Sequence, residues 1–216
     1  QDHWAVRSQN RAEEAINSGF FAREISPVTL PDGSQVSTDD GPRAGTTYEK
    51  ISQLKPVFRP NGTVTAGNAC PLNDGAAAVI VTSDEKAKEL GLTPLARIVA
   101  TGVSGLSPEI MGLGPIEATR KALANAGMTI DDIDLYEINE AFAVQVLGSA
   151  RELGMDHDKL NISGGAIALG HPFGMTGARI TATLLNNLTT QDKTFGLETM
   201  CVGGGQGMAM IIERLS

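Results

Sequence analysis

Four short segments of the sequence place a reactive side chain at an abrupt change in the local backbone. They contain Cys70 in GNACPL, Asn139 in NEAF, His171 in GHP and Cys201 just before VGGGQG. An imidazole that titrates near neutral pH can act as a general base, and an activated thiol can attack a substrate or carry a proton. An asparagine amide can hold a water molecule, and glycine N–H groups can stabilise a developing oxyanion. These residue types are the components of a nucleophilic or acid–base active site.

Three of these segments follow strands that the sequence predicts. Hydrophobic patterning favours strands at 133–139, 160–165 and 195–202, and the amide, the imidazole and the second thiol come at or after the ends of these strands. The carboxyl ends of strands line the ligand crevice in open α/β sheets. We therefore expect these three side chains to converge at one edge of a sheet.

The remaining elements alternate between helices and strands. Apolar periodicity and turn residues predict helices at 3–19, 84–91, 114–127, 141–154 and 176–188, and further strands at 76–83, 96–103 and 207–214. The run AAAVIVTS at 76–83 is continuously apolar, as expected of a buried strand. The strands on either side of VGGGQG predict an antiparallel hairpin. The alternation as a whole predicts an α/β fold in which helices cover a mixed sheet.

Composition and charge exclude several classes of function. The 216 residues carry a net charge of −8, and no cluster of Lys and Arg suggests a surface for nucleic acid or an anionic membrane. No apolar run reaches the length of about 18 residues that a membrane-spanning helix needs, and no secretory leader opens the chain. The two cysteines do not form a disulfide framework, which favours reduced thiols and a cytoplasmic location. No CxxC or HxxxH spacing indicates a metal site.

Each candidate also has a simpler interpretation. A histidine near a turn is often structural, and a cysteine at the end of an apolar strand is often a small core residue. GHPFGMTG lacks the GK[ST] of a P-loop, and VGGGQG does not open a helix as a dinucleotide-binding fingerprint does. Glu140 could act as a general base or could anchor the local backbone. The residue types alone leave these alternatives open.

The joint occurrence of several motifs resembles the thiolase family. NEAFA, GGAIALGHPFGMTGAR and CVGGGQGMAM follow one another as in the C-terminal half of acetyl-CoA acetyltransferases and 3-ketoacyl-CoA thiolases. The earlier segments NGTVTAGNACPLNDGAAAVIV and MGLGPIEATRKAL resemble the same family, so the similarity covers essentially the whole chain. The segments EIMGLGPIEA and GLETMCVGGGQGMAMIIERLS are more similar to degradative thiolases, including types that act on steroid side chains. This similarity implies a role in fatty acid metabolism and lipid degradation, with a fatty acyl or a steroid acyl group as the substrate.

The resemblance implies a role for each catalytic candidate. In the family, a nucleophilic cysteine accepts the acyl group, and His171 matches the histidine that activates it. Cys201 matches a second cysteine, which moves the proton at the α-carbon of the acetyl unit. Asn139 matches the asparagine that holds a water molecule and, together with His171, forms an oxyanion hole. Gly203 matches a backbone donor of a second oxyanion hole.

The resemblance also implies coenzyme A and acyl-CoA as substrates, with no covalently bound cofactor and no metal. The residues that match positions along the coenzyme A site are Arg43, Phe58, Ala66, Cys70, Ala141 and Phe142. Arg43 matches a cation near the coenzyme A phosphates, and the others match positions around the pantetheine. Cys70 stands where the family has a serine. The thiol keeps the size of the side chain and weakens its hydrogen bond.

No cysteine of this chain matches the family's nucleophile, so we expect the 216 residues to be inactive alone. By the same comparison, 1–73 resembles the end of a lid domain, 74–93 the closing strand and helix of an N-terminal core, and 94–216 a complete C-terminal core. The chain also begins inside a predicted helix and without an initiator Met, which indicates sequence upstream.

A chain of this kind would leave a face of its core exposed. The implied partners are therefore a missing N-terminal half or a separate chain, in a homodimer or homotetramer. Two alternatives remain open. The chain could be a non-catalytic module with residual coenzyme A binding, or one subunit of a split enzyme.

Overall fold

The computed structural model describes residues 1–216 and divides into two compact units. Unit 1 consists of Gln1–Asn73, Glu140–Ala143 and Ser163–His171, and unit 2 consists of Asp74–Asn139, Val144–Ile162 and Pro172–Ser216. The chain therefore passes between the units several times, and both NEAF and GHP lie at such passages.

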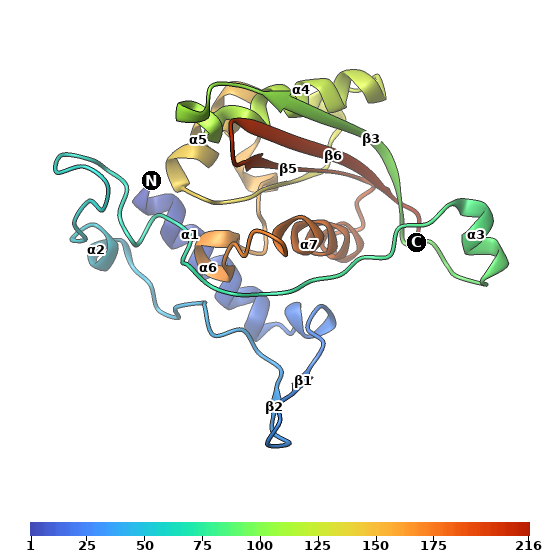
Figure 1. Ribbon diagram of the computed structural model, residues 1–216, viewed down its shortest axis with the longest axis horizontal. Helices are drawn as coiled ribbons and strands as arrows, with labels where there is room; N and C mark the ends of the chain where they lie inside the picture. Colours follow the sequence, from blue (N-terminus) through green and yellow to red (C-terminus); the bar gives the residue numbers. More distant parts are fainter. The chain divides into compact units, whose positions relative to one another are not determined.

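Unit 1 is built around one long helix. Its elements are α1 (Asp2–Asn17), η1 (Phe21–Arg23), β1 (Val28–Thr29), β2 (Gln35–Val36), α2 (Tyr48–Ile51) and α6 (Ala166–Leu169). Helix α1 confirms the helix predicted near the N-terminus, and it packs against α6 (Figure 1). A small apolar cluster of Ala15, Phe20 and Phe21 packs against Leu169 at the end of α6. The segment between η1 and α2 is otherwise irregular apart from the short antiparallel pair β1–β2.

Unit 2 contains the larger sheet and its helices. The elements are α3 (Asp84–Glu89), β3 (Ala96–Gly105), η2 (Pro108–Leu113), α4 (Gly114–Ala126), η3 (Ile130–Asp132), β4 (Leu135–Ile138), α5 (Ala143–Leu153), η4 (His157–Lys159), α7 (Thr176–Thr190), β5 (Phe195–Val202) and β6 (Gln206–Arg214). These bounds confirm the predicted helices that begin at 84, 114, 141 and 176 to within a few residues at each end. They confirm the strands at 96–103, 133–139, 195–202 and 207–214 equally well.

The sheet of unit 2 is mixed. Its strand order is β3-β6-β5-β4, and only the pair β4–β5 is parallel. Helix α4 covers β3 and β6 on one face, and α7 covers β4 and β5 on the other (Figure 1). Gly102 lets the backbone of α4 approach closely, because a Cβ at this position would clash with the carbonyl oxygen of Ala118. The predicted α/β fold with helices on a mixed sheet is therefore confirmed.

The strand predicted at 76–83 is wrong. These residues form no strand and are exposed, and the side chains of Ile80 and Val81 are 87% and 72% exposed. A strand needs a neighbouring strand to pair its backbone groups, and no strand of this chain pairs with this run. The apolar run therefore stays exposed in this chain, because none of its six strands pairs with it.

The strand predicted at 160–165 is also wrong. Only Leu160 pairs with β4, through an isolated parallel bridge to Tyr136. Asn161 then turns into the left-handed region at φ 47°, which breaks the extended backbone. Its side-chain amide replaces the strand, because it donates to the carbonyl oxygen of Ile138 and accepts from the N–H of the same residue, both at 2.9 Å.

A buried ionic cluster lies between the sheet and α7. Glu137 of β4 and Glu198 of β5 are neighbours in the parallel register, and both are buried. The guanidinium of Arg179 lies 3.9 Å from the carboxylate of Glu137, and the hydroxyl of Thr181 donates to Glu198 at 2.9 Å. Burial raises the pKa of Glu198 to about 7, although the bond from Thr181 and the charge of Arg179 oppose this rise.

The raised pKa of Glu198 makes stability depend on pH. Because the folded pKa is about 7 and the unperturbed value is 4.5, the folded state holds the proton more tightly between these limits. The free energy of unfolding should therefore fall by roughly 3 kcal/mol as pH rises from 4.5 to 7, if this group acts alone. Glu198→Gln should remove most of this fall and stabilise the chain at pH 8, since a neutral amide avoids the cost of burying charge.

Urea denaturation of the 216-residue chain at a series of pH values would measure this effect. Glu85→Gln is a suitable control, because Glu85 is exposed and lies in the same unit. The control should follow the wild-type pH dependence. A parallel pH dependence in wild type and Glu198→Gln would show that the carboxylate of Glu198 does not carry this titration.

Candidate active site

His171 lies in the irregular segment directly after α6, and not after a strand as the sequence predicts. Gly170 ends α6 with φ at 91°, a conformation that favours glycine. A Cβ at Gly170 would also clash with the side chain of Asn73. The backbone N–H of His171 donates to the Oδ1 atom of Asn73 at 3.2 Å. The bare backbone around His171 is therefore required by its close packing against Asn73.

Glu140 is a fully buried charged residue of unit 1. Its carboxylate is fully buried and accepts three hydrogen bonds, from the indole N–H of Trp4 at 2.9 Å, the hydroxyl of Ser8 at 2.5 Å and the backbone N–H of Ile167 at 3.2 Å. A Cβ at Gly165 would clash with this carboxylate. These contacts favour the interpretation of Glu140 as an anchor of the backbone over the alternative of a general base.

Unit 1 brings together four of the predicted coenzyme A contacts. The N–H of Cys70 donates to the carbonyl oxygen of Ala141 at 3.0 Å, and the backbone of Phe142 pairs with that of Ala69. The ring of Phe58 meets the ring of Phe142 edge to face, with 5.8 Å between centroids. Phe58 is 69% exposed, so its ring offers an open apolar surface beside the buried loop.

The other two predicted coenzyme A residues are both exposed. Ala66 is exposed in the loop before Cys70. Arg43 is exposed, and its backbone N–H donates to the side chain of Gln9 at 2.8 Å, which fixes its loop on α1.

Burial raises the pKa of the Cys70 thiol, and the negative charge of Glu140 adds to the rise. A raised thiol pKa opposes a nucleophilic role for Cys70.

Asn139 follows β4 and has an unusual environment within unit 2. Its backbone N–H donates to the carbonyl oxygen of Thr199 at 3.0 Å, which fixes it beside β5. Its side chain is 1% exposed, and no protein group forms a hydrogen bond with either atom of its amide. An unpaired buried amide is costly and needs a specific explanation. This amide has the right properties to hold a small polar molecule.

Cys201 lies near the end of β5, on the strand next to Asn139. It is not part of a disulfide, is 5% exposed, and faces Gly207 of β6 in the antiparallel register. Gly203 follows in the exposed turn to β6. The parallel pair β4–β5 therefore brings Asn139 and Cys201 to the same end of the sheet, where the sequence predicts them to be. Convergence of His171 of unit 1 with these two residues stays a prediction.

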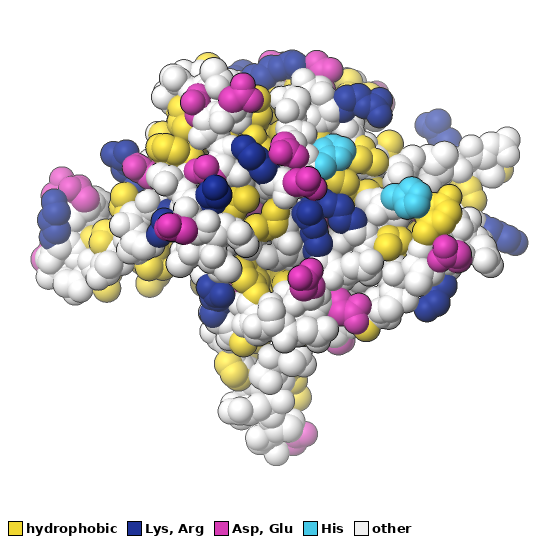
Figure 2. All heavy atoms as spheres, turned by 180° about the vertical axis from the view of Figure 1, so that it is seen from behind, with side chains coloured by type: hydrophobic (Ala, Val, Ile, Leu, Met, Phe, Trp, Pro, Cys, Tyr) yellow, Lys and Arg dark blue, Asp and Glu magenta, His cyan; other side chains and the backbone are white.

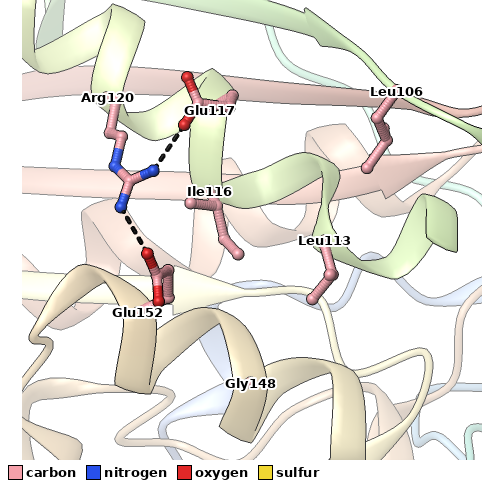
Figure 3. Close-up of a pocket in the computed structure, with 7 residues that line it drawn as sticks. All are labelled: Leu106, Leu113, Ile116, Glu117, Arg120, Gly148 and Glu152. Carbon is pink, nitrogen blue, oxygen red and sulfur yellow. Dashed lines mark hydrogen bonds and ion pairs between the residues drawn. The ribbon is translucent and has the colours of Figure 1, made fainter.

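A groove of unit 2 lies away from these residues. Its volume is about 390 Å³, and its lining comes from the β3–η2 connection, η2, α4 and α5 (Figure 3). The lining residues are Leu106, Leu113, Ile116, Glu117, Arg120, Gly148 and Glu152. The guanidinium of Arg120 bridges the carboxylates of Glu117 and Glu152 at 2.5 and 2.8 Å. None of the candidate catalytic residues lines this groove, so we do not assign it to the active site.

Metal-binding groups, charge clusters and membrane-spanning helices define other kinds of site. No group of three or more His, Cys, Asp or Glu side chains is arranged to hold a metal ion. Acidic and basic side chains are interspersed on the face drawn in Figure 2. None of the helices combines the length and apolar character that crossing a membrane requires.

The sequence patterns do not identify the residues that hold His171 and Glu140 in place. Asn73 is 98 residues before His171, and Trp4 and Ser8 are 136 and 132 residues before Glu140. The only local signals are Trp4 and Ser8, which share one face of the predicted N-terminal helix, and Asn73, an asparagine in a loop.

Comparison with known proteins defines the class of this chain. The family model described as "Thiolase, C-terminal domain" matches residues 92–214, and the one described as "Thiolase, N-terminal domain" matches residues 1–85. The chain therefore belongs to the thiolase family, which is a family of enzymes.

Individual relatives support this assignment along the whole chain. The acetyl-CoA acetyltransferases of Thiocystis violacea and Escherichia coli (strain K12) are 52% and 51% identical to it over 219 residues. Both alignments include 100% of this chain and 56% of the relative. The chain thus spans about half the length of the curated relatives it matches.

Solved structures agree with the sequence relatives. The acetyl-CoA acetyltransferase of Bacillus anthracis superposes with a TM-score of 0.96 at 50% identity, over 100% of this chain and 55% of that one. Human mitochondrial 3-ketoacyl-CoA thiolase, solved in complex with CoA, superposes with a TM-score of 0.92 at 44% identity, over 99% of this chain and 54% of that one. The fold of this chain is therefore the thiolase fold.

Proposed function

We propose that the intact protein carrying this sequence is a thiolase that cleaves or forms 3-ketoacyl-CoA by acyl transfer. The observation that carries this proposal is that two buried polar groups lie at the ends of adjacent parallel strands. They are the amide of Asn139, which forms no hydrogen bond with a protein group, and the thiol of Cys201. The sequence relatives that share the whole chain are named acetyl-CoA acetyltransferases, which supports the same reaction class.

The reaction begins with transfer of an acyl group to the nucleophilic cysteine. The imidazole of His171 accepts the thiol proton while the sulfur attacks the thioester carbonyl. The carbon–sulfur bond to coenzyme A then breaks, and the departing thiolate takes the proton back from His171. Backbone N–H groups, including that of Gly203, stabilise the charge on the carbonyl oxygen during this step.

The second step forms or cleaves the carbon–carbon bond. In the direction of condensation, the Cys201 thiolate removes a proton from the α-carbon of a second acetyl-CoA. The carbanion attacks the acyl-enzyme, and the bond from carbon to the nucleophilic sulfur breaks to release 3-ketoacyl-CoA. The proton taken up by Cys201 then passes to the released thiolate, so that both cysteines return to their starting states. A water molecule held by Asn139, together with His171, stabilises the enolate oxygen. Cleavage runs through the same steps in reverse.

The coenzyme A substrate binds along unit 1. The rings of Phe58 and Phe142 and the small residues Ala66 and Ala141 line the pantetheine, while Arg43 attracts the phosphates. Cys70 contacts the pantetheine through a weaker hydrogen bond than a serine would make. The edge-to-face pair of Phe58 and Phe142 and the exposure of Phe58 support this binding mode.

The nucleophilic cysteine lies outside these 216 residues, in another part of the protein or in a partner chain. In this arrangement 1–73 ends a lid domain, 74–93 closes an N-terminal core, and 94–216 is the C-terminal core. The exposed apolar run at 76–83 supports the need for such a partner, because exposed apolar patches mark interaction surfaces. The assembled enzyme is a homodimer or homotetramer.

Mapping of the acyl group tests this proposal. After the intact protein is incubated with acetyl-CoA, denatured and digested, one acetyl group should be found on a cysteine other than Cys70 and Cys201. The 216-residue chain alone should take up none. Acetylation of Cys70 or Cys201 would overturn the assignment of the nucleophile. An intact protein that takes up no acetyl group and still binds coenzyme A in calorimetry would instead be a non-catalytic module.

A further inference from the structure

The fully buried carboxylate of Glu140 joins two distant segments of unit 1. It accepts from Trp4 and Ser8 on α1, and from the backbone N–H of Ile167 in the first turn of α6. We propose that Glu140 is a positioning residue that fixes α6, and through it the imidazole of His171. This inference rests on the proposed function, because it concerns the histidine assigned there to activation of the nucleophile.

Helix α6 cannot hold its own position. It has four residues, Ala166–Leu169, and isolated helices of that length are not stable in water. Its N-cap residue, Gly165, has no side chain that could cap it. The position of α6 must therefore come from its neighbours.

The neighbours of α6 act on its first turn. The hydroxyl of Ser8 accepts from the N–H of Gly165 at 3.0 Å and donates to Glu140, so one side chain of α1 connects the two. The carboxylate of Glu140 accepts from the N–H of Ile167, and the amide of Gln9 donates to the carbonyl oxygen of Ile167 at 3.1 Å. Both backbone groups of Ile167 are thus held by side chains, and Glu140 is the only charged one of these.

The connection from α6 to the imidazole of His171 is short. His171 follows the last residue of α6 after a single glycine, Gly170. Asn73 holds the backbone N–H of His171 from the other side. Two hydrogen bonds therefore hold the backbone on either side of Gly170. The Glu140 carboxylate binds the N–H of Ile167, and the Asn73 side chain binds the N–H of His171. Loss of the first leaves α6 free to shift while His171 stays attached at one point.

The substitution Glu140→Gln tests this role with little change in volume. An amide oxygen can replace only one of the two carboxylate oxygens, and the other position then carries an NH₂ group. If the oxygen faces Ser8 and Ile167, the NH₂ group faces the indole N–H of Trp4, which is also a donor. In the flipped orientation the NH₂ group faces the N–H of Ile167. Either orientation leaves one pair of donors in conflict.

A second substitution should relieve this conflict. Trp4→Phe removes the indole donor and keeps an aromatic ring in the same position, so the double variant with Glu140→Gln can direct its amide oxygen at Ser8 and Ile167. Glu140→Gln alone should lower kcat of the intact enzyme roughly 100-fold through displacement of His171, with little change in KM for acetyl-CoA. The double variant should recover a substantial part of this loss.

A destabilised control separates positioning from general loss of structure. Leu188→Ala opens a cavity in the apolar cluster of unit 2, far in sequence from α1 and α6. It should lower the melting temperature at least as much as Glu140→Gln and leave kcat close to the wild-type value. A double variant no more active than Glu140→Gln, or a control that loses kcat equally, would overturn the proposal.

Hydrogen exchange of the 216-residue chain provides a readout that does not depend on activity. Glu140→Gln should speed amide exchange across 166–171, and the double variant should slow it again. Unchanged exchange in this segment would overturn the positioning role directly. If the wild-type enzyme instead transfers no acyl group while exchange at 166–171 responds as described, the proposed function fails and the role of Glu140 in holding α6 stands.

Discussion

Replacement of His171 by asparagine is expected to lower kcat for acetyl transfer by the intact protein about 1,000-fold, since general acid–base catalysis contributes roughly that much. Asparagine can still form hydrogen bonds at this position, but its amide cannot accept a proton near neutral pH. The backbone at position 171 should keep its conformation, because the hydrogen bond from its N–H to Asn73 does not involve the imidazole. The rate of coenzyme A release from acetyl-CoA, followed with a thiol reagent, measures this loss.

The chain provides a matched control for this experiment. His157 is exposed at the start of η4 in unit 2, and His157→Asn makes the same chemical change away from the candidate site. This variant should keep the wild-type rate. A rate within a few-fold of wild type for His171→Asn would show that activation of the nucleophile comes from another group, and the proposed mechanism would then lose its base.

The fold could be predicted wherever the chain supplies its own packing partners. The strands at 195–202 and 207–214 pair with each other across VGGGQG, so local pattern and final structure agree. The run at 76–83 has an equally strong apolar pattern and forms no strand. An apolar pattern indicates which side chains need burial. It does not indicate which neighbouring strand would pair with the backbone N–H and C=O groups of the run.

The candidate site could be predicted in part for the same reason. Asn139 and Cys201 both lie at the ends of predicted strands that pair in parallel, so the fold class alone brings them to one end of the sheet. His171 follows α6 instead of a strand, and its position depends on contacts with residues far away in sequence. The side chains of Glu140 and Asn73 make those contacts with buried or backbone groups, and such pairings have no periodic signature.

The buried environment of Glu198 could not be predicted from the sequence either. Glu198 alternates with apolar residues in FGLETMCV, a pattern that is compatible with a solvent-facing position on a sheet. In the structure α7 covers this face, and the carboxylate is buried beside Glu137 and Arg179. The raised pKa of Glu198 follows from this covering helix and not from its neighbours in the chain.

Replacement of Cys201 by alanine should separate the two halves of the proposed reaction. The thiol of Cys201 is assigned to proton transfer at the α-carbon, so Cys201→Ala should lower kcat for condensation roughly 1,000-fold. Transfer of the first acyl group to the nucleophile does not need this proton transfer. The variant should therefore still release one equivalent of coenzyme A per active site in a rapid burst, and then stop.

Cys70→Ser gives the contrasting result that the assignment requires. The hydroxyl should strengthen the hydrogen bond to the pantetheine, so the variant should lower KM for acetyl-CoA and leave the burst and the steady rate in place. If Cys201→Ala abolished the burst as well, Cys201 would act in acyl transfer itself. Cys201 is buried near the end of β5, on the strand next to Asn139, whose amide has no protein partner. A buried thiol can exchange a proton with bound substrate without competition from bulk solvent. This position therefore favours a Cys201→Ala variant that keeps the burst and loses the steady rate.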